Sequence, residues 1–150
     1  MPIVNPQPGF DPVSPFNPQS SGGRVLLAED YEPNALFIAE VLAMAGYEVE
    51  LVTDGCVAVE RAAAEVFCAI IMDIEMPHMD GIAATRAIRQ HEAALGLSPV
   101  PILGITGHTM ASMHRLCLAA GMTDIMCKPF RPAALEARLE AAIREPLPAG

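Results

Sequence analysis

Acidic side chains occupy two separate places in the sequence where an apolar run ends. Glu29 and Asp30 follow the run RVLLA (24–28), and Asp73 follows the run AIIM (69–72). A buried strand gains nothing from ending in acid, because two carboxylates about 4 Å apart repel by roughly 4 kcal/mol at an effective dielectric near 20. A cation is therefore expected between them, and hard oxygen ligands without soft partners favour Mg²⁺ over zinc or copper.

Two further polar side chains follow later apolar runs. Thr106 closes PILGIT (101–106), and Lys128 follows DIMC (124–127). A threonine hydroxyl and a lysine ammonium beside clustered carboxylates suit a phosphoryl group in transfer, where catalysis is mostly positioning and charge neutralisation. A carboxylate can itself accept the group as an acyl phosphate, so Asp73 is the predicted nucleophile.

Five repeats of a strand followed by a helix are expected to position these groups. The predicted strands cover residues 24–28, 48–53, 69–73, 101–106 and 124–127. The predicted helices run from Pro33 to Gly46, from the cap Asp54 to about Glu65, from Gly81 to about Glu92, up to Gly121, and over 132–144. This alternation predicts an α/β fold, a five-stranded parallel sheet with helices on both faces. In such sheets ligands bind beyond the carboxyl ends of the strands, where the polar groups fall.

The overall composition is typical of one globular domain. With 150 residues, of which 52% are hydrophobic, the chain can build a core. A net charge of −9 opposes attraction to phosphate backbones, so nucleic acid is not expected as a partner. No apolar run approaches the roughly 18 residues that span a bilayer, and no signal-peptide pattern opens the chain. We expect no membrane insertion and a cytoplasmic location.

The two ends of the chain differ in composition from its middle. Residues 1–23 carry six prolines and end in SSGG, which predicts a flexible tail. Residues 146–150 form a second, shorter tail, so the domain is expected over 24–145. The cysteines show no Cys-x-x-Cys pairing and are interpreted as reduced core residues, with zinc binding and disulfides as alternatives. They are Cys56, Cys68, Cys117 and Cys127.

Four segments of the sequence together resemble the receiver domain of two-component response regulators, especially the type found in hybrid histidine kinases and phosphorelays. LLAEDYEPN, IIMDIEMPHMDG, PILGITGHT and CKPF match that family in kind, order and separation. The resemblance covers residues 24 to about 145 and implies the (βα)5 flavodoxin-like receiver fold. It also implies a phosphoacceptor module that takes a phosphoryl group, with Mg²⁺, from a histidine kinase or a histidine phosphotransfer domain.

The resemblance implies a metal-binding role for each acidic residue. Asp73 corresponds to the phosphoacceptor, and Asp30 to a direct magnesium ligand. Glu29 would act mainly through a metal-bound water. The backbone of Glu75 would serve the metal through its carbonyl and would also border the phosphoryl group.

A second set of residues is implied to hold the phosphoryl group. Thr106 would donate a hydrogen bond to a phosphoryl oxygen, with the Gly107 backbone N–H nearby. Lys128 would pair with the same group, and Pro129 after it implies a cis peptide bond. The side chain of His108 lies where the family borders the phosphate and influences its hydrolysis.

Two places depart from the family or leave alternatives open. Ile125 stands where the family commonly places an aromatic ring that reorients with the threonine, so a ring-based switch is not expected. The helix over 34–45 is apolar nearly all round, which indicates either burial on both sides or an exposed docking patch for the phosphohistidine partner. The patch would use Phe37, Ile38 or Met44.

Three classes of function compete. A signalling receiver that is not a turnover enzyme accounts for every matched segment. Because only 22 residues follow Lys128, no output domain is expected, and the module would act through protein partners. A haloacid-dehalogenase-like phosphohydrolase would need Asp-x-Asp at the nucleophile, where this chain has Glu75, and an acidic pair after the lysine. A pseudo-receiver scaffold would typically lose the acidic pair, the acceptor or the lysine, and all are present.

Overall fold

The computed structural model describes residues 23–145. The predicted tails, 1–23 and 146–150, lie outside the described residues except for Gly23. The strands are β1 (Gly23–Ala28), β2 (Tyr47–Val52), β3 (Ala69–Asp73), β4 (Ile102–Thr106) and β5 (Asp124–Cys127). The helices are α1 (Glu32–Met44), α2 (Gly55–Ala64), α3 (Gly81–Leu95), α4 (Ala111–Ala120) and α5 (Pro132–Arg144). Each predicted strand and helix is present, and β1 begins at Gly23, one residue before the expected domain boundary.

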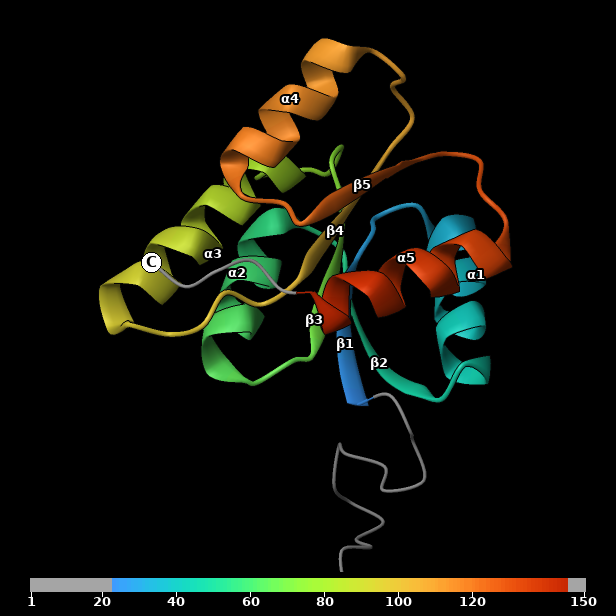
Figure 1. The fold of residues 1–150 in the computed structure, drawn as a ribbon, viewed down its shortest axis with the longest axis horizontal. Coiled ribbons are helices and arrows are strands. Elements are labelled where there is room, and N and C mark those ends of the chain that lie inside the picture. The colour runs from blue at the N-terminus through green and yellow to red at the C-terminus, as the bar shows by residue number, and fades with distance from the viewer. Residues whose placement is uncertain (1–22, 146–150) are drawn as a thin grey trace, which may run out of the picture.

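The five strands form one parallel sheet in the order β2-β1-β3-β4-β5. Helices α1 and α5 cover one face, and α2, α3 and α4 cover the other (Figure 1). The predicted α/β fold with helices on both faces is confirmed. Because every strand runs in the same direction, all five carboxyl ends meet at one edge of the sheet.

The apolar strands build a core on both sides of the sheet. Leu26 and Ile70 pack beneath α2 and α3, whereas the next residues, Leu27 and Ile71, belong to the cluster beneath α1 and α5. Successive side chains of a strand point to opposite faces, so a strand covered by helices on both faces must be apolar throughout. Strands β3 and β4 are buried along their whole length.

Two helices begin at aspartates: Asp54 caps α2, as predicted, and Asp80 caps α3. Asp54 Oδ1 accepts a hydrogen bond from the Val57 backbone N–H at 2.9 Å, and Asp80 Oδ1 accepts one from Ala83 at 2.8 Å. The expected end of α3 at Glu92 is wrong. The helix continues to Leu95 through good helix formers and ends at Gly96, whose φ of 66° lies in the left-handed region that glycine favours.

The interpretation of all four cysteines as core residues is wrong in part. All four lie within the described residues and form no disulfide there, but only Cys117 is buried. Cys68 and Cys127 are half-buried, and Cys56, in the first turn of α2, is exposed.

In the same part of the chain, residues 23–145, no helix is both long and apolar enough to cross a membrane.

Gly81 allows α3 to start directly against the end of β3. A Cβ at this position would lie 2.3 Å from the Asp73 carbonyl oxygen and 2.9 Å from the Ile74 Cα. Because both neighbours are backbone atoms, we expect Gly81→Ala to lower the free energy of unfolding by about 2–4 kcal/mol, measured by urea denaturation. Gly107→Ala is the matched control: a Cβ there meets nothing within 4 Å, and a change within about 0.5 kcal/mol is expected. Equal stability of the two variants would contradict the steric argument.

Candidate functional site

Three carboxylates meet at the carboxyl edge of the sheet. Ala28 of β1 is level with Met72 of β3, so the residues that follow them, Glu29 and Asp73, come side by side. One carboxylate oxygen from each of Glu29, Asp30 and Asp73 lies within 4.8 Å of the other two. Glu29 is 1% exposed and Asp73 is 2% exposed, whereas Asp30 is open to solvent. Two buried acids and one exposed acid thus surround one point at the rim.

Lys128 crosses from the end of β5 to the same point. Its Nζ lies 3.2 Å from Asp73 Oδ1, to which it donates a hydrogen bond, and 3.4 Å from Glu29 Oε1. Its backbone N–H donates to the Thr106 carbonyl at 2.7 Å, which ties the start of the last loop to β4. The peptide bond to Pro129 is cis, as the resemblance implies. The lysine is therefore positioned to neutralise charge at the acceptor carboxylate.

The loops after β3 and β4 complete the rim. Thr106 Oγ1 accepts a hydrogen bond from the His108 backbone N–H at 2.9 Å, which leaves its own O–H group able to donate to another acceptor. The space beside Gly107 is open. The Glu75 backbone N–H lies 3.4 Å from Asp73 Oδ1, and the Glu75 carboxylate lies 2.6 Å from His108 Nε2. This side-chain contact joins the two loops across the site.

The electrostatics of the site depend on burial. Burial, together with the neighbouring Glu29, raises the pKa of Asp73 to about 7, and Lys128 opposes this rise. Burial alone would lower the pKa of Lys128, but the carboxylates of Asp73 and Glu29 outweigh it and raise that pKa, so the ammonium stays charged at neutral pH. The site holds more negative charge than a single lysine can neutralise.

The residues present fit a hard divalent cation. Within the described part of the chain no group donates a hydrogen bond to Glu29 Oε1, which is buried and has only the ion pair with Lys128. An orphaned buried oxygen beside two more carboxylates is a feature that a cation would satisfy. All the side-chain atoms in the cluster that could bind a metal are carboxylate oxygens, which favours Mg²⁺ over softer metals.

The sequence model of the response regulator receiver domain matches residues 25–140, most of the chain. The chain belongs to this family. The site just described lies at the carboxyl ends of the strands of this receiver domain. The residues that were predicted from the sequence to form it all lie at this edge of the sheet or in the loops beside it. Glu29, Asp30, Asp73 and Lys128 converge on one point, while Glu75, Thr106 and Gly107 lie in or beside the loops that border it.

Curated relatives of this receiver domain are sensor kinases that are much longer than it. It is 40% identical over 111 residues to the sensor protein GacS of Pseudomonas syringae pv. syringae, covering 74% of this chain and 12% of GacS. It is 38% identical over 108 residues to the histidine-protein kinase BarA of Escherichia coli K12, covering 71% of this chain and 11% of BarA. The chain therefore spans about an eighth of the length of these relatives or less.

Solved receiver structures superpose well on this one. The receiver domain of the sensor histidine kinase PA1611 from Pseudomonas aeruginosa PAO1 gives a TM-score of 0.75 at 38% identity, over 83% of this chain and all of that one. That structure contains a magnesium ion coordinated in its active site cleft. The chemotaxis response regulator CheY4 of Vibrio cholerae gives a TM-score of 0.71 at 31% identity, over 80% of this chain and 98% of that one.

Ile125 is a core residue in this receiver domain. It is 8% exposed and packs in the cluster beneath α2 and α3, together with Met122. An aliphatic side chain held in this way has no ring that could turn between a buried and an exposed position. The absence of a ring-based switch at this position remains a prediction from the residue type.

A hollow that the sequence did not predict lies beside Lys128. It encloses about 470 Å³ and is lined by Asn34, Phe37, Ile38, Lys128, Pro129 and Phe130. Phe37 of α1 and Phe130 of the last loop lie with their ring centroids 6.1 Å apart. Phe130 could have been predicted as a site residue because it ends the matched segment CKPF. Its contact with Phe37 of α1 could not be predicted from the sequence alone.

Proposed function

We propose that this receiver domain takes a phosphoryl group from a phosphohistidine of a histidine kinase or histidine phosphotransfer domain onto Asp73, with Mg²⁺. The observation that supports this most strongly is the buried Asp73 carboxylate, 3.2 Å from the Lys128 ammonium and within a cluster of three acids. A structural ion pair needs one acid for one base. A cluster of three acids beside one lysine, with the acceptor among the three, is arranged for a ligand that brings further positive charge.

In the proposed transfer, a carboxylate oxygen of Asp73 bonds to phosphorus as the phosphorus–nitrogen bond of the donor breaks. The electron pair of that bond stays with the imidazole nitrogen, and an acyl phosphate forms on Asp73. Lys128 balances the charge that gathers on the phosphoryl oxygens, and the free O–H of Thr106 donates to one of them.

Magnesium, when bound, supplies positive charge that offsets repulsion between the acceptor carboxylate and the incoming phosphoryl group. Asp30, Asp73 and the carbonyl of Glu75 would hold it, with Glu29 acting through water. The chain's own groups then orient the acceptor, exclude solvent from it and pair with the transferred oxygens. The product stays on the chain, so we propose a phosphoacceptor rather than a turnover enzyme.

Incubation with acetyl phosphate and Mg²⁺ tests this function, with intact mass as the measurement. One added phosphoryl group is expected on the wild type and none on Asp73→Asn. No mass gain in the wild type would favour a binding scaffold over a phosphoacceptor. Continuous release of phosphate from a generic phosphate monoester would instead favour a phosphohydrolase.

The surface beside the site suggests where the donor docks. Phe37 and Ile38 both line the hollow that contains Lys128, but Phe37 is 41% exposed whereas Ile38 is 1% exposed. Of the three residues considered for a docking patch, Ile38 is therefore excluded because it packs in the core. A donor seated over the hollow would hold its phosphohistidine next to Asp73, since Lys128 contacts both places.

We expect Phe37→Glu to slow transfer from a phosphohistidine protein about tenfold or more, because a charge in the hollow removes an apolar contact of the size that interface hot spots supply. Phosphorylation by acetyl phosphate should be unchanged, since the acceptor is untouched. The measurement is the rate of radiolabel transfer from the phosphorylated donor. Met44→Glu is the matched control: Met44 is on the same helix and 82% exposed but does not line the hollow. Equal effects of the two variants would reject this docking surface.

A further inference from the structure

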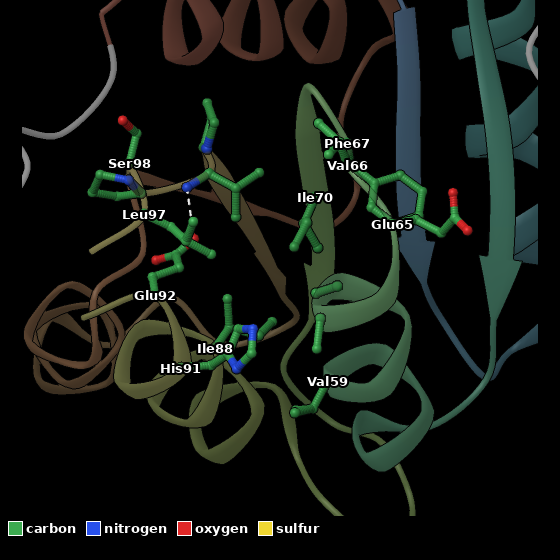
Figure 2. Close-up of a pocket in the computed structure, with 15 residues that line it drawn as sticks. Val59, Glu65, Val66, Phe67, Ile70, Ile88, His91, Glu92, Leu97 and Ser98 are labelled. Carbon is green, nitrogen blue, oxygen red and sulfur yellow. Dashed lines mark hydrogen bonds between the residues drawn. The ribbon is translucent and has the colours of Figure 1, made fainter. Parts of the chain in front are cut away.

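An apolar groove, drawn in Figure 2, is lined by residues at the amino ends of β3 and β4, the end of the sheet opposite the acidic site. It encloses about 360 Å³ between α2, α3 and the amino ends of β3 and β4. Val59 of α2, Ile70 of β3 and Ile88 of α3 all contribute to its lining (Figure 2). Its volume falls in the range of about 300–1,000 Å³ that is typical of binding pockets. None of the residues that form the acidic site lines it.

The rim of the groove is apolar and open to solvent. Val66 is 89% exposed and Leu97 is 48% exposed, whereas Phe67, which lines the same groove, is buried. Two acids line its edge, and both are already paired. The Glu92 carboxylate accepts hydrogen bonds from the Val100 backbone N–H and from a guanidinium on α3, and the Glu65 carboxylate forms an ion pair with Arg24. What remains for a ligand is a largely apolar surface.

The chain enters the domain at the same end. Cys68 donates its backbone N–H to the Arg24 carbonyl at 2.8 Å, and a Cβ on Gly23 would lie 3.4 Å from Cys68 Sγ. The Arg24 guanidinium lies over the ring of Phe67, 5.0 Å from its centroid, and Phe67 lines the groove. The segment before Gly23 is therefore attached about one strand spacing, roughly 5 Å, from the groove wall.

The segment 10–18 has a repeat that suits such a groove. It reads FDP-VSP-FNP, three triplets of an apolar residue, a polar residue and a proline. A polyproline II helix has three residues per turn, so Phe10, Val13 and Phe16 would form one stripe in that conformation. Asp11 is the only charged residue in the segment. Prolines limit the conformations of the free segment and so reduce the entropy lost when it is ordered.

We propose that this segment docks in the groove of its own domain as a polyproline II stretch, with Phe16 and Val13 entering between α2 and α3. Seven residue steps separate Phe16 from Gly23, a reach of about 20 Å at roughly 3.1 Å per residue. Tethering of this length gives an effective concentration on the order of millimolar, so even a weak site is filled. The tether favours the chain's own segment over a free partner.

Methyl NMR spectroscopy of the full chain tests the proposal, with the variant F10S/V13S/F16S. We expect the methyl resonances of Val59 and Val66 to shift in the variant, and their nuclear Overhauser contacts to the Phe16 ring, present in the wild type, to be lost. Unchanged Val59 and Val66 resonances would overturn the proposal. Because the altered residues precede β1, loss of folding is not expected. Methyl groups on the opposite face of the sheet, such as those of Val41, should keep their wild-type resonances if the variant is folded.

Two matched controls identify the occupant. D11S/N17S changes the polar positions of the same triplets and should leave the groove resonances as in the wild type. Leu147→Ser changes the other segment outside the described residues. Shifts of the Val59 and Val66 resonances in this variant, but not in F10S/V13S/F16S, would overturn the proposal. A wild-type signal that disappears on dilution would also overturn it, in favour of a segment from a second copy of the chain.

Discussion

Asp73→Asn is expected to abolish phosphoryl acceptance and to stabilise the metal-free domain at the same time. The amide keeps the shape of the carboxyl group but cannot form an acyl phosphate. It also removes one of two buried negative charges, which face each other with only Lys128 between them. Loss of activity together with a gain in stability is the opposite of what a damaged fold would give.

The gain in stability should depend on pH. The folded-state pKa of Asp73 is raised to about 7 from an ordinary value of 3.8, so the folded protein binds this proton more tightly than the unfolded chain does. The resulting stabilisation is full below about pH 4 and is lost as the pH rises through 7. Asp73→Asn should therefore be more stable than the wild type by on the order of 3 kcal/mol at pH 8 and by little at pH 4.

Urea unfolding without divalent cations, from pH 4 to pH 8, measures this difference. Glu60→Gln is the control, because Glu60 is an exposed acid of α2, where a change within about 0.5 kcal/mol is expected at every pH. A stability difference between Asp73→Asn and the wild type that is the same at both ends of the pH range would contradict the assigned cause.

Removal of Mg²⁺ is expected to have the second largest effect. With a chelator present, phosphoryl acceptance should stop, because the acceptor then has only Lys128 to offset repulsion by the incoming oxygens. Asp30→Asn should weaken the affinity for Mg²⁺ by roughly 10- to 100-fold, since it removes one of three clustered carboxylates. Calorimetric titration of the metal measures the affinity.

The affinity for Mg²⁺ should also fall with pH. A proton and the cation compete for Asp73, and because its pKa is about 7, each pH unit below 7 should weaken binding by up to about tenfold. Above pH 8 the affinity should be constant. In Asp73→Asn this pH dependence should be absent, although the metal still has Glu29 and Asp30. An affinity that is equal at pH 6 and pH 8 in the wild type would show that Asp73 does not contact the metal.

The fold was predictable because its signals are local. Apolar runs of four to six residues, aspartates that cap α2 and α3, and glycines after the helices mark the elements within a few residues of each end. The misjudged end of α3 has the same origin. Glu92 resembles a polar helix end, but its carboxylate folds back to the Val100 backbone, and the helix continues past it.

The sequence by itself determined which residues reach the rim of the sheet. Parallel strands place the residues that follow them at one edge, so the order of segments was enough to bring Glu29, Asp73 and Lys128 together. The tertiary structure decided their distances, and with them the burial that raises the pKa of Asp73 to about 7.

Tertiary packing alone also decided that Phe37 is exposed beside Lys128 while Ile38 is buried. It likewise brought the Glu75 carboxylate into contact with His108. The physical reason is that burial and pair distances between residues far apart in the chain depend on how helices settle on the sheet. No local pattern in the sequence encodes that.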